Sequence, residues 1–142
     1  MKPGLFKDPT QAGLYHLPAK HQLDLPRLVA KAHLTLLAAN LGDCTDKYQA
    51  LSELGKACKF PAWYGVNFDA LHDCLTDPDW QSKMGVVLQI SGLDLLHERD
   101  PDSFSTLTEV LQSAASTRSA ENTPLWILLS SPTPGIADLP EA

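Results

Sequence analysis

Basic residues are scarce in this 142-residue sequence, which has 11 Lys and Arg against 17 Asp and Glu and a formal net charge of −6. Surfaces that bind nucleic acid depend on Lys and Arg to hold the phosphate backbone, so this balance disfavours direct nucleic-acid binding. The same balance favours a basic protein partner and a fast association that weakens with salt. The charge therefore indicates a protein that binds something positive.

Cysteine and long apolar runs are also in short supply. Cys44, Cys58 and Cys74 make an odd number and form no C-x-x-C pair, so we expect reduced thiols, as in the cytoplasm. The first nine residues contain no apolar core of a secretory signal, and no apolar run approaches the length of a membrane span. We therefore predict a soluble, cytoplasmic protein that does not bind membranes.

Motifs of the common enzyme classes are missing as well. There is no Gly-rich phosphate loop, no G-x-S-x-G and no H-E-x-x-H. Cys74 is a poor candidate nucleophile, because its acidic neighbours should raise the pKa of the thiol and suppress the thiolate. We predict that the protein is not an enzyme and uses no cofactor and no metal ion.

What the sequence does contain is an aromatic loop that leads into a short acidic helix. Residues 60–82 include four Asp and no Lys or Arg. Asn67 is a good N-cap, because its side-chain oxygen can accept a hydrogen bond from a free N–H group of the first turn. Pro78 cannot continue a helix, so we expect the helix to end near Thr76.

The predicted helix has two distinct faces at about 100° per residue. An apolar stripe, expected to be buried, contains Phe68, Leu71 and Leu75. A polar arc on the opposite side contains Asp69, His72, Asp73 and Thr76. The positive end of the helix dipole partly stabilises the first of these carboxylates but gives little help to the second. A binding partner therefore explains the charge of Asp73 better than the fold does.

Large rings and a glycine precede this helix. Trp63 and Tyr64 are amphipathic side chains of the kind that recognition surfaces use. Gly65 lies between them and the helix cap, where it allows a tight turn and a close approach of the backbone. We interpret the loop and the acidic face as one binding surface.

This segment resembles the signature of a known family. It reads Pro61-x-Trp63-Tyr64-Gly65-x-Asn67-x-Asp69-Ala70-Leu71-x-Asp73-Cys74-Leu75-Thr76. The run is similar to the barstar family of intracellular inhibitors of barnase-type ribonucleases, in its branch of longer bacterial chains. The similarity is strong across 61–76 and extends more weakly over about 34–130. It implies a barstar-like α/β fold and a ribonuclease inhibitor that blocks the active site of the enzyme.

The resemblance also implies roles for individual residues. In the family, the carboxylate matching Asp73 takes the place of an RNA phosphate among basic catalytic residues. The carboxylate matching Asp69 pairs with cationic groups nearby, and further matched positions belong to the contact surface. The predicted partner-binding set is Trp63, Tyr64, Gly65, Asn67, Phe68, Asp69, His72, Asp73, Thr76 and Asp77.

Three positions depart from the family pattern. His72 stands where barstar has an aromatic ring, and Asp77 stands where it has Gly. Ser113, or its neighbour Gln112, aligns with a further acidic contact that this chain lacks. These differences leave another partner open, so the alternative function is an acidic binding or immunity module for a different basic toxin domain.

A less favoured alternative is a small metal-dependent hydrolase that uses His72, Asp69 and Asp73. One imidazole and two carboxylates on a short helix have no clear further ligand nearby in the sequence. A contact role for His72 is the better interpretation.

Apolar segments that alternate with helical ones predict the architecture. Near-continuous apolar runs are typical of parallel strands that are covered on both faces. Strands are predicted at 34–41, 85–91 and 125–130, with 14–17 as a candidate fourth at an edge, and helices at 25–31, 46–58, 68–76 and 102–118. We expect an α/β fold with a small, mainly parallel sheet of three or four strands packed by helices.

Finer expectations concern helix caps and the core. Thr45 should cap the helix at 46–58 and place Tyr48 on the same side as its buried leucines. The helix at 102–118 should open at Asp102 or the next residue. Trp80 and Trp126 are expected in the core or at its edge.

The chain is expected to form one barstar-like domain at 33–130. Residues 1–32 form an N-terminal extension packed onto the core, and the first 13 of them, polar with Pro and Gly, should be loose. Residues 131–142 contain three Pro and should form a flexible tail. We expect the free protein to be a monomer.

Overall fold

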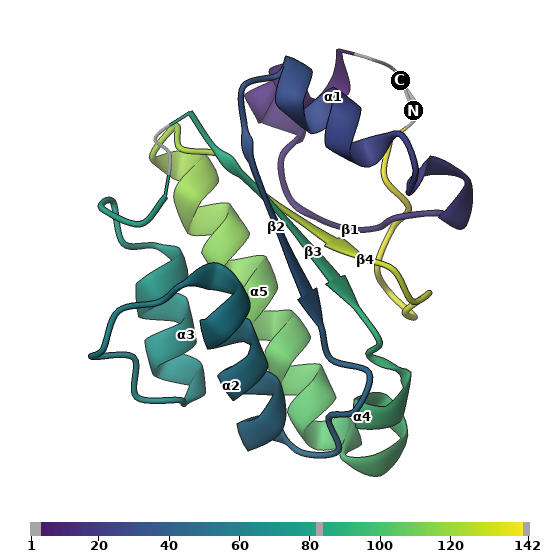
Figure 1. The fold of residues 1–142 in the computed structure, drawn as a ribbon, viewed down its shortest axis with the longest axis vertical. Coiled ribbons are helices and arrows are strands. Elements are labelled where there is room, and N and C mark those ends of the chain that lie inside the picture. The colour runs from purple at the N-terminus through teal and green to yellow at the C-terminus, as the bar shows by residue number, and fades with distance from the viewer. Residues whose placement is uncertain (1–3, 82–83, 141–142) are drawn as a thin grey trace.

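The protein is an α/β structure built on one four-stranded parallel sheet (Figure 1). The computed structural model describes residues 4–81 and 84–140. The strands are β1 (Leu14–His16), β2 (Thr35–Asn40), β3 (Val86–Ser91) and β4 (Leu125–Leu129), in the order β1-β4-β3-β2. The predicted parallel sheet is confirmed, and the candidate fourth strand, β1, lies at one edge.

Five α-helices connect and cover the strands. They are α1 (Leu25–Lys31), α2 (Lys47–Cys58), α3 (Phe68–Leu75), α4 (Asp94–Arg99) and α5 (Pro101–Ala120). Helices α2, α3 and α5 lie on one face of the sheet, whereas α1 and the N-terminal turns lie on the other (Figure 1). Within the part of the chain that the structure describes, no helix is both long and apolar enough to cross a membrane.

Burial of the sheet on both faces explains why its strands are apolar nearly throughout. Successive side chains of a strand point to opposite faces. In β4, Leu125, Ile127 and Leu129 pack in the core under α2, α3 and α5. Trp126 and Leu128 pack on the opposite side, in the core under α1. In β4 neither face is left to solvent, so no polar alternation is present to mark that strand.

The N-terminal segment departs from expectation, because residues 4–13 are not loose. Two 3-10 turns, Leu5–Lys7 and Pro9–Gln11, place Leu5 and Phe6 in the core beside α1. The ring of Phe6 packs edge to face on Trp126, with 4.9 Å between centroids. Pro and Gly made this stretch resemble a loose segment, but two buried apolar side chains are enough to anchor it.

The C-terminal segment is held in a similar way. Leu139 is buried, and its backbone N–H donates to the carbonyl of His16 at 2.8 Å. The imidazole of His16 lies 2.8 Å from the carboxylate of Asp138. The described part of the predicted tail, up to residue 140, is therefore attached to the outer edge of β1.

The predictions for the starts of α2 and α5 and for the orientation of Tyr48 are wrong. Asp46, not Thr45, caps α2, with its carboxylate accepting from the backbone N–H of Gln49 at 2.9 Å. Asp100 caps α5, whose first residue is a proline, and the charged helix α4 was not predicted. Tyr48 is 63% exposed, because the buried side of α2 is set by Leu51 and Leu54.

Removing the Phe6 ring tests whether the N-terminal segment belongs to the core. Phe6 is 2% exposed, so Phe6→Ala should lower the free energy of unfolding by about 3–5 kcal/mol, the usual cost for a buried phenylalanine. Leu23, which is 94% exposed, supplies the control, and Leu23→Ala should change it by less than about 0.5 kcal/mol. Urea unfolding measures both, and equal small effects would mean that the segment does not stabilise the fold.

Candidate functional site

Helix α3 is positioned by its cap and by its apolar face. The side chain of Asn67 accepts a hydrogen bond from the backbone N–H of Ala70 at 2.7 Å, as predicted. Leu71 and Leu75 are fully buried and Cys74 nearly so. The remaining member of the apolar stripe, Phe68, is half-buried against the same core. One side of this short helix is therefore fixed, and the other faces solvent.

The solvent face of α3 carries two carboxylates that lack an ion-pair partner among the described residues. Asp69 and Asp73 are exposed, and neither forms an ion pair with a described Lys or Arg. The ion pairs found among the described residues lie elsewhere, at His16–Asp138, Arg27–Asp24 and Lys56–Glu53. Two like charges four residues apart on a helix repel each other. Within residues 4–81 and 84–140, no ion pair offsets this repulsion.

The aromatic loop before α3 divides into an exposed ring and an anchored one. Trp63 is 56% exposed. The hydroxyl of Tyr64 donates to the carbonyl of Leu51 at 2.7 Å, and its ring packs 4.9 Å from that of Phe60. A Cβ added to Gly55 would lie 2.6 Å from the Tyr64 ring, so α2 comes very close to the ring. Tyr64 thus fixes the loop on α2 and leaves Trp63 free for contact.

The strained backbone position in the loop is Val66, which the sequence alone did not indicate. Val66 has φ 51°, a left-handed conformation that is unfavourable for a β-branched residue and costs about 1–3 kcal/mol. Gly65 is not the left-handed residue; its role is close approach, since a Cβ there would lie 3.0 Å from Asn67 Nδ2. Such strain is often found at binding sites, and no composition signal predicts it.

Two of the positions that depart from the family pattern are in contact. His72 Nε2 lies 3.2 Å from the hydroxyl of Ser113 on α5. The hydroxyl of Thr76 donates to the carbonyl of His72 at 2.7 Å. Asp77 shapes the next turn, because its carboxylate accepts from the backbone N–H of Asp79 at 2.9 Å. The C-terminal half of the acidic face is therefore a network of short polar contacts.

Arg118 is a positioning residue that sequence reasoning missed. Its side chain is nearly buried, donates to the carbonyls of Leu75 and Thr123 at 3.3 and 2.7 Å, and lies 5.7 Å from the Trp80 ring. Burial lowers the pKa of this guanidinium. A cation at the end of α3 also interacts favourably with the helix dipole. The sequence does contain a signal that this residue is buried. Position 118 continues the helical spacing of the buried residues Phe104, Leu107, Leu111 and Ala114 along α5.

The three cysteines are free and buried, as expected for reduced thiols. Burial first, and then Asp77 and Asp73, raise the pKa of the Cys74 thiol to about 11. Burial likewise raises the pKa of Cys58 to about 12. Trp80, in the core as predicted, donates its indole N–H to the carbonyl of Cys58 at 2.8 Å. These thiols are packing residues and would remain protonated at neutral pH.

The metal-dependent hydrolase named above would need a further ligand beside His72, Asp69 and Asp73. No three His, Cys, Asp or Glu side chains among residues 4–81 and 84–140 lie close enough together to hold a metal ion. His72 uses its Nε2 atom on Ser113 rather than facing a third ligand. The geometry of α3 instead suits recognition of a cationic surface.

The geometry describes a short helix with an exposed acidic face on a small parallel α/β fold. A family model described as Barstar (barnase inhibitor) matches residues 34–130, which is more than half of the chain. The chain belongs to the barstar family. None of the curated proteins compared with it matches.

Arg118 can be tested through the stability of α3. Arg118→Ala would leave the carbonyls of Leu75 and Thr123 without this donor, so the free energy of unfolding should fall by about 1–3 kcal/mol. Amide exchange at the C-terminal end of α3 should also become faster. Arg99→Ala, at an exposed cation of α4, is the matched control. Urea unfolding in which both variants behave alike would refute the anchoring role.

Proposed function

We propose that this protein inhibits a barnase-type ribonuclease by placing the loop at 61–66 and helix α3 in the active site of the enzyme. The observation that carries the proposal is the exposed acidic face of α3, whose Asp69 and Asp73 form no ion pair with any Lys or Arg that the structure describes. The carboxylate of Asp73 takes the place of an RNA phosphate among the basic catalytic residues. Asp69 pairs with cationic groups beside it.

Preorganisation of the surface supports this function. Binding costs less free energy when side chains and loops are already ordered in the free protein. Asn67 caps α3, Arg118 holds its other end, and Tyr64 fixes the loop on α2. The net charge of −6 adds long-range attraction toward a basic enzyme and should raise the association rate at low salt.

The predicted partner-binding residues divide into two groups under this proposal. Contact residues present polar or aromatic groups to the enzyme: Trp63, Gly65, Asn67, Asp69, His72, Asp73 and Thr76. Positioning residues act through these: Tyr64 and Phe68 pack against the protein itself, and Asp77 shapes the turn after α3. The inhibitor works in the cytoplasm as a monomer that pairs with one enzyme molecule.

A second candidate partner is another basic toxin domain, and one contact favours it. His72 and Ser113 form a polar pair where the family pattern has an aromatic ring and a carboxylate. A cationic group on barnase that binds both the aromatic ring and the carboxylate would find neither group on this chain. The cognate enzyme is then a different ribonuclease of this type or a related toxin.

Neutralising Asp73 tests the proposal directly. The parent protein should inhibit RNA cleavage by a barnase-type ribonuclease at one-to-one stoichiometry, and Asp73→Ala should bind less tightly by about 2–5 kcal/mol. That range is typical of removing one partner from a buried charge pair. The barnase–barstar complex is itself one of the systems in which such losses were measured. Asp73 is exposed in the free protein, so the unfolding curve should stay unchanged.

Glu98→Gln on α4 is the control, because it removes one exposed negative charge far along the chain from the site. Its inhibition curve should match that of the parent. Equal inhibition by parent and Asp73→Ala would contradict phosphate mimicry. Absence of inhibition by the parent, with tight binding to another basic toxin domain, would instead support the second candidate.

A further inference from the structure

One edge of the sheet is open. Strand β2 ends the order β1-β4-β3-β2, and within the described residues no strand pairs with its outer side. The N–H of Thr35 donates to Gly85, and that of Leu41 to Ser91, so these residues face β3. Backbone groups alternate in direction along a strand. The N–H and C=O groups of Leu36, Ala38 and Asn40 therefore point away from the sheet.

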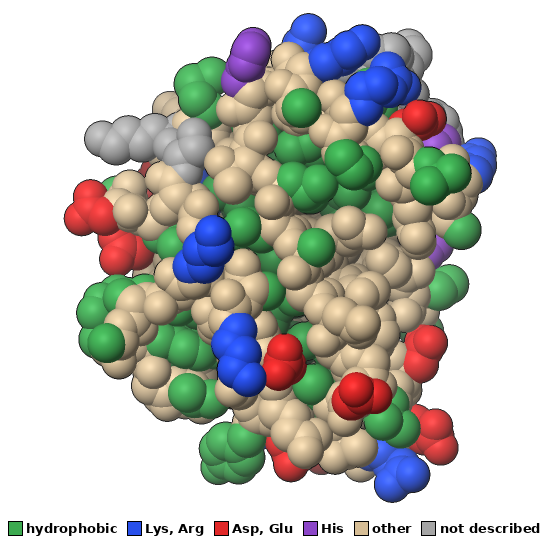
Figure 2. All heavy atoms as spheres, in the orientation of Figure 1, with side chains coloured by type: hydrophobic (Ala, Val, Ile, Leu, Met, Phe, Trp, Pro, Cys, Tyr) green, Lys and Arg blue, Asp and Glu red, His purple; other side chains and the backbone are tan. Residues whose placement is uncertain are grey.

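This edge lacks the usual protection against pairing with another chain. Edge strands commonly carry Lys, Pro or a bulge that blocks further pairing. The sequence of β2 is TLLAAN, with none of these, and it pairs with β3 in unbroken register. In Figure 1, β2 is the strand nearest the viewer, and in the same view Figure 2 shows mainly uncharged surface across the middle of this face.

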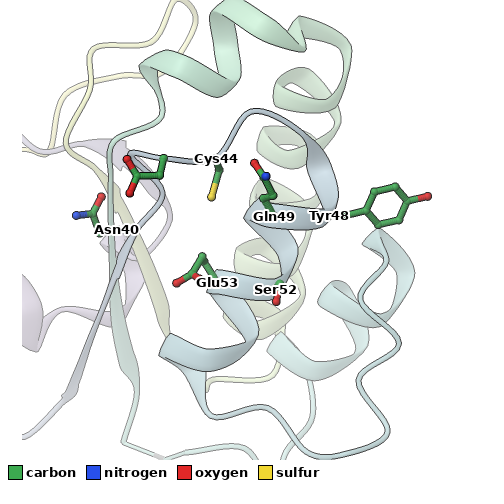
Figure 3. Close-up of a pocket in the computed structure, with 7 residues that line it drawn as sticks. Asn40, Cys44, Tyr48, Gln49, Ser52 and Glu53 are labelled. Atoms are coloured by element: carbon green, nitrogen blue, oxygen red, sulfur yellow. The ribbon is translucent and has the colours of Figure 1, made fainter.

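A cavity of about 570 Å³ adjoins the C-terminal end of this strand (Figure 3). Its lining includes Asn40 at the end of β2, Asp43 and Cys44 in the following turn, and Ser52 and Glu53 on α2. In Figure 3 the Cys44 sulfur and the Glu53 carboxylate are directed into the space between strand and helix, whereas Tyr48 points away.

The cavity is negatively charged. Among the described residues, Glu53 forms an ion pair only with Lys56 of the same helix. Their Oε1 and Nζ atoms lie 3.4 Å apart, and both side chains are exposed. Burial first, and then Glu53, Asp43 and Asp46, raise the pKa of the Cys44 thiol. No Lys or Arg belongs to the lining. A cationic side chain is therefore the complementary occupant.

We propose that β2 and this cavity form a docking groove for an extended, basic segment of a protein partner. The segment adds to the sheet as a strand beside β2, using the outward backbone groups of Leu36, Ala38 and Asn40. It places a Lys or Arg side chain between Asp43 and Glu53. Strand addition supplies affinity through main-chain hydrogen bonds, and a side-chain pocket supplies specificity.

A basic segment fits the groove better than a second copy of this chain. Each copy carries a net charge of −6, so two copies repel each other and both attract a basic chain. The groove uses neither Asp69 nor Asp73, so the inference stands independently of the proposed inhibition. Its failure would leave the ribonuclease-inhibitor proposal untouched.

Amide exchange with a model peptide tests the groove in the full-length protein. The probe is a capped hexapeptide of alternating Lys and Val, and its matched control replaces Lys with Glu. Binding of the Lys peptide should slow exchange at Leu36, Ala38 and Asn40 but not at Leu37 and Ala39, whose N–H groups already face β3. Only strand addition predicts this alternation.

Two sets of variants complete the test. Asp43→Asn combined with Glu53→Gln should weaken binding of the Lys peptide about tenfold, a loss of about 1.4 kcal/mol, whereas Glu98→Gln should not. Ala38→Pro removes one outward N–H. Ala38→Lys leaves the backbone groups unchanged but adds a positive charge to the edge, which repels the Lys peptide. Both should weaken binding, and the second keeps the test decisive if the first does not fold.

Several results would overturn the proposal. These are equal binding of the Lys and Glu peptides, no slowing at the three outward amides, or slowing confined to α3. Slowing at the same amides without peptide, rising with protein concentration and accompanied by dimers in sedimentation, would show that a second copy occupies the edge instead.

Discussion

The structure depends on the one-sided burial of α3. Leu71 and Leu75 lock an eight-residue helix onto the core, and this leaves Asp69 and Asp73 on a face that the fold does not neutralise. A helix this short has little stability of its own and relies on tertiary packing. The same packing that stabilises the helix therefore holds the two charges in place for a partner.

Contacts at both ends turn this helix into a rigid surface. Asn67 caps its start, and Arg118 reaches the carbonyl of Leu75 at its end from within α5. Tyr64 ties the preceding loop to α2 through the carbonyl of Leu51. Each of these groups makes hydrogen bonds inside the protein, and the carboxylates of α3 and the Trp63 ring stay exposed beside them.

Much of this could be predicted from the sequence, and the misses have physical reasons. Periodicity and the Asn67 cap located α3, and apolar runs located the sheet. The burial of Leu5 and Phe6 was missed because Pro and Gly nearby indicated a loose segment. The pairing of His72 with Ser113 is a tertiary contact between distant segments, and the left-handed backbone of Val66 has no signal in the composition. Local patterns carry no information about those.

In the proposed inhibition, the acidic face of α3 occupies the phosphate site of a ribonuclease. Calorimetric titration of this protein into a barnase-type ribonuclease, with and without a saturating mononucleotide in the active site, tests it most directly. Competition predicts that the apparent association constant falls in proportion to the fraction of enzyme sites left free of nucleotide, so a saturating nucleotide lowers it many-fold. Unchanged affinity would show that the protein binds elsewhere on the enzyme and would contradict the account.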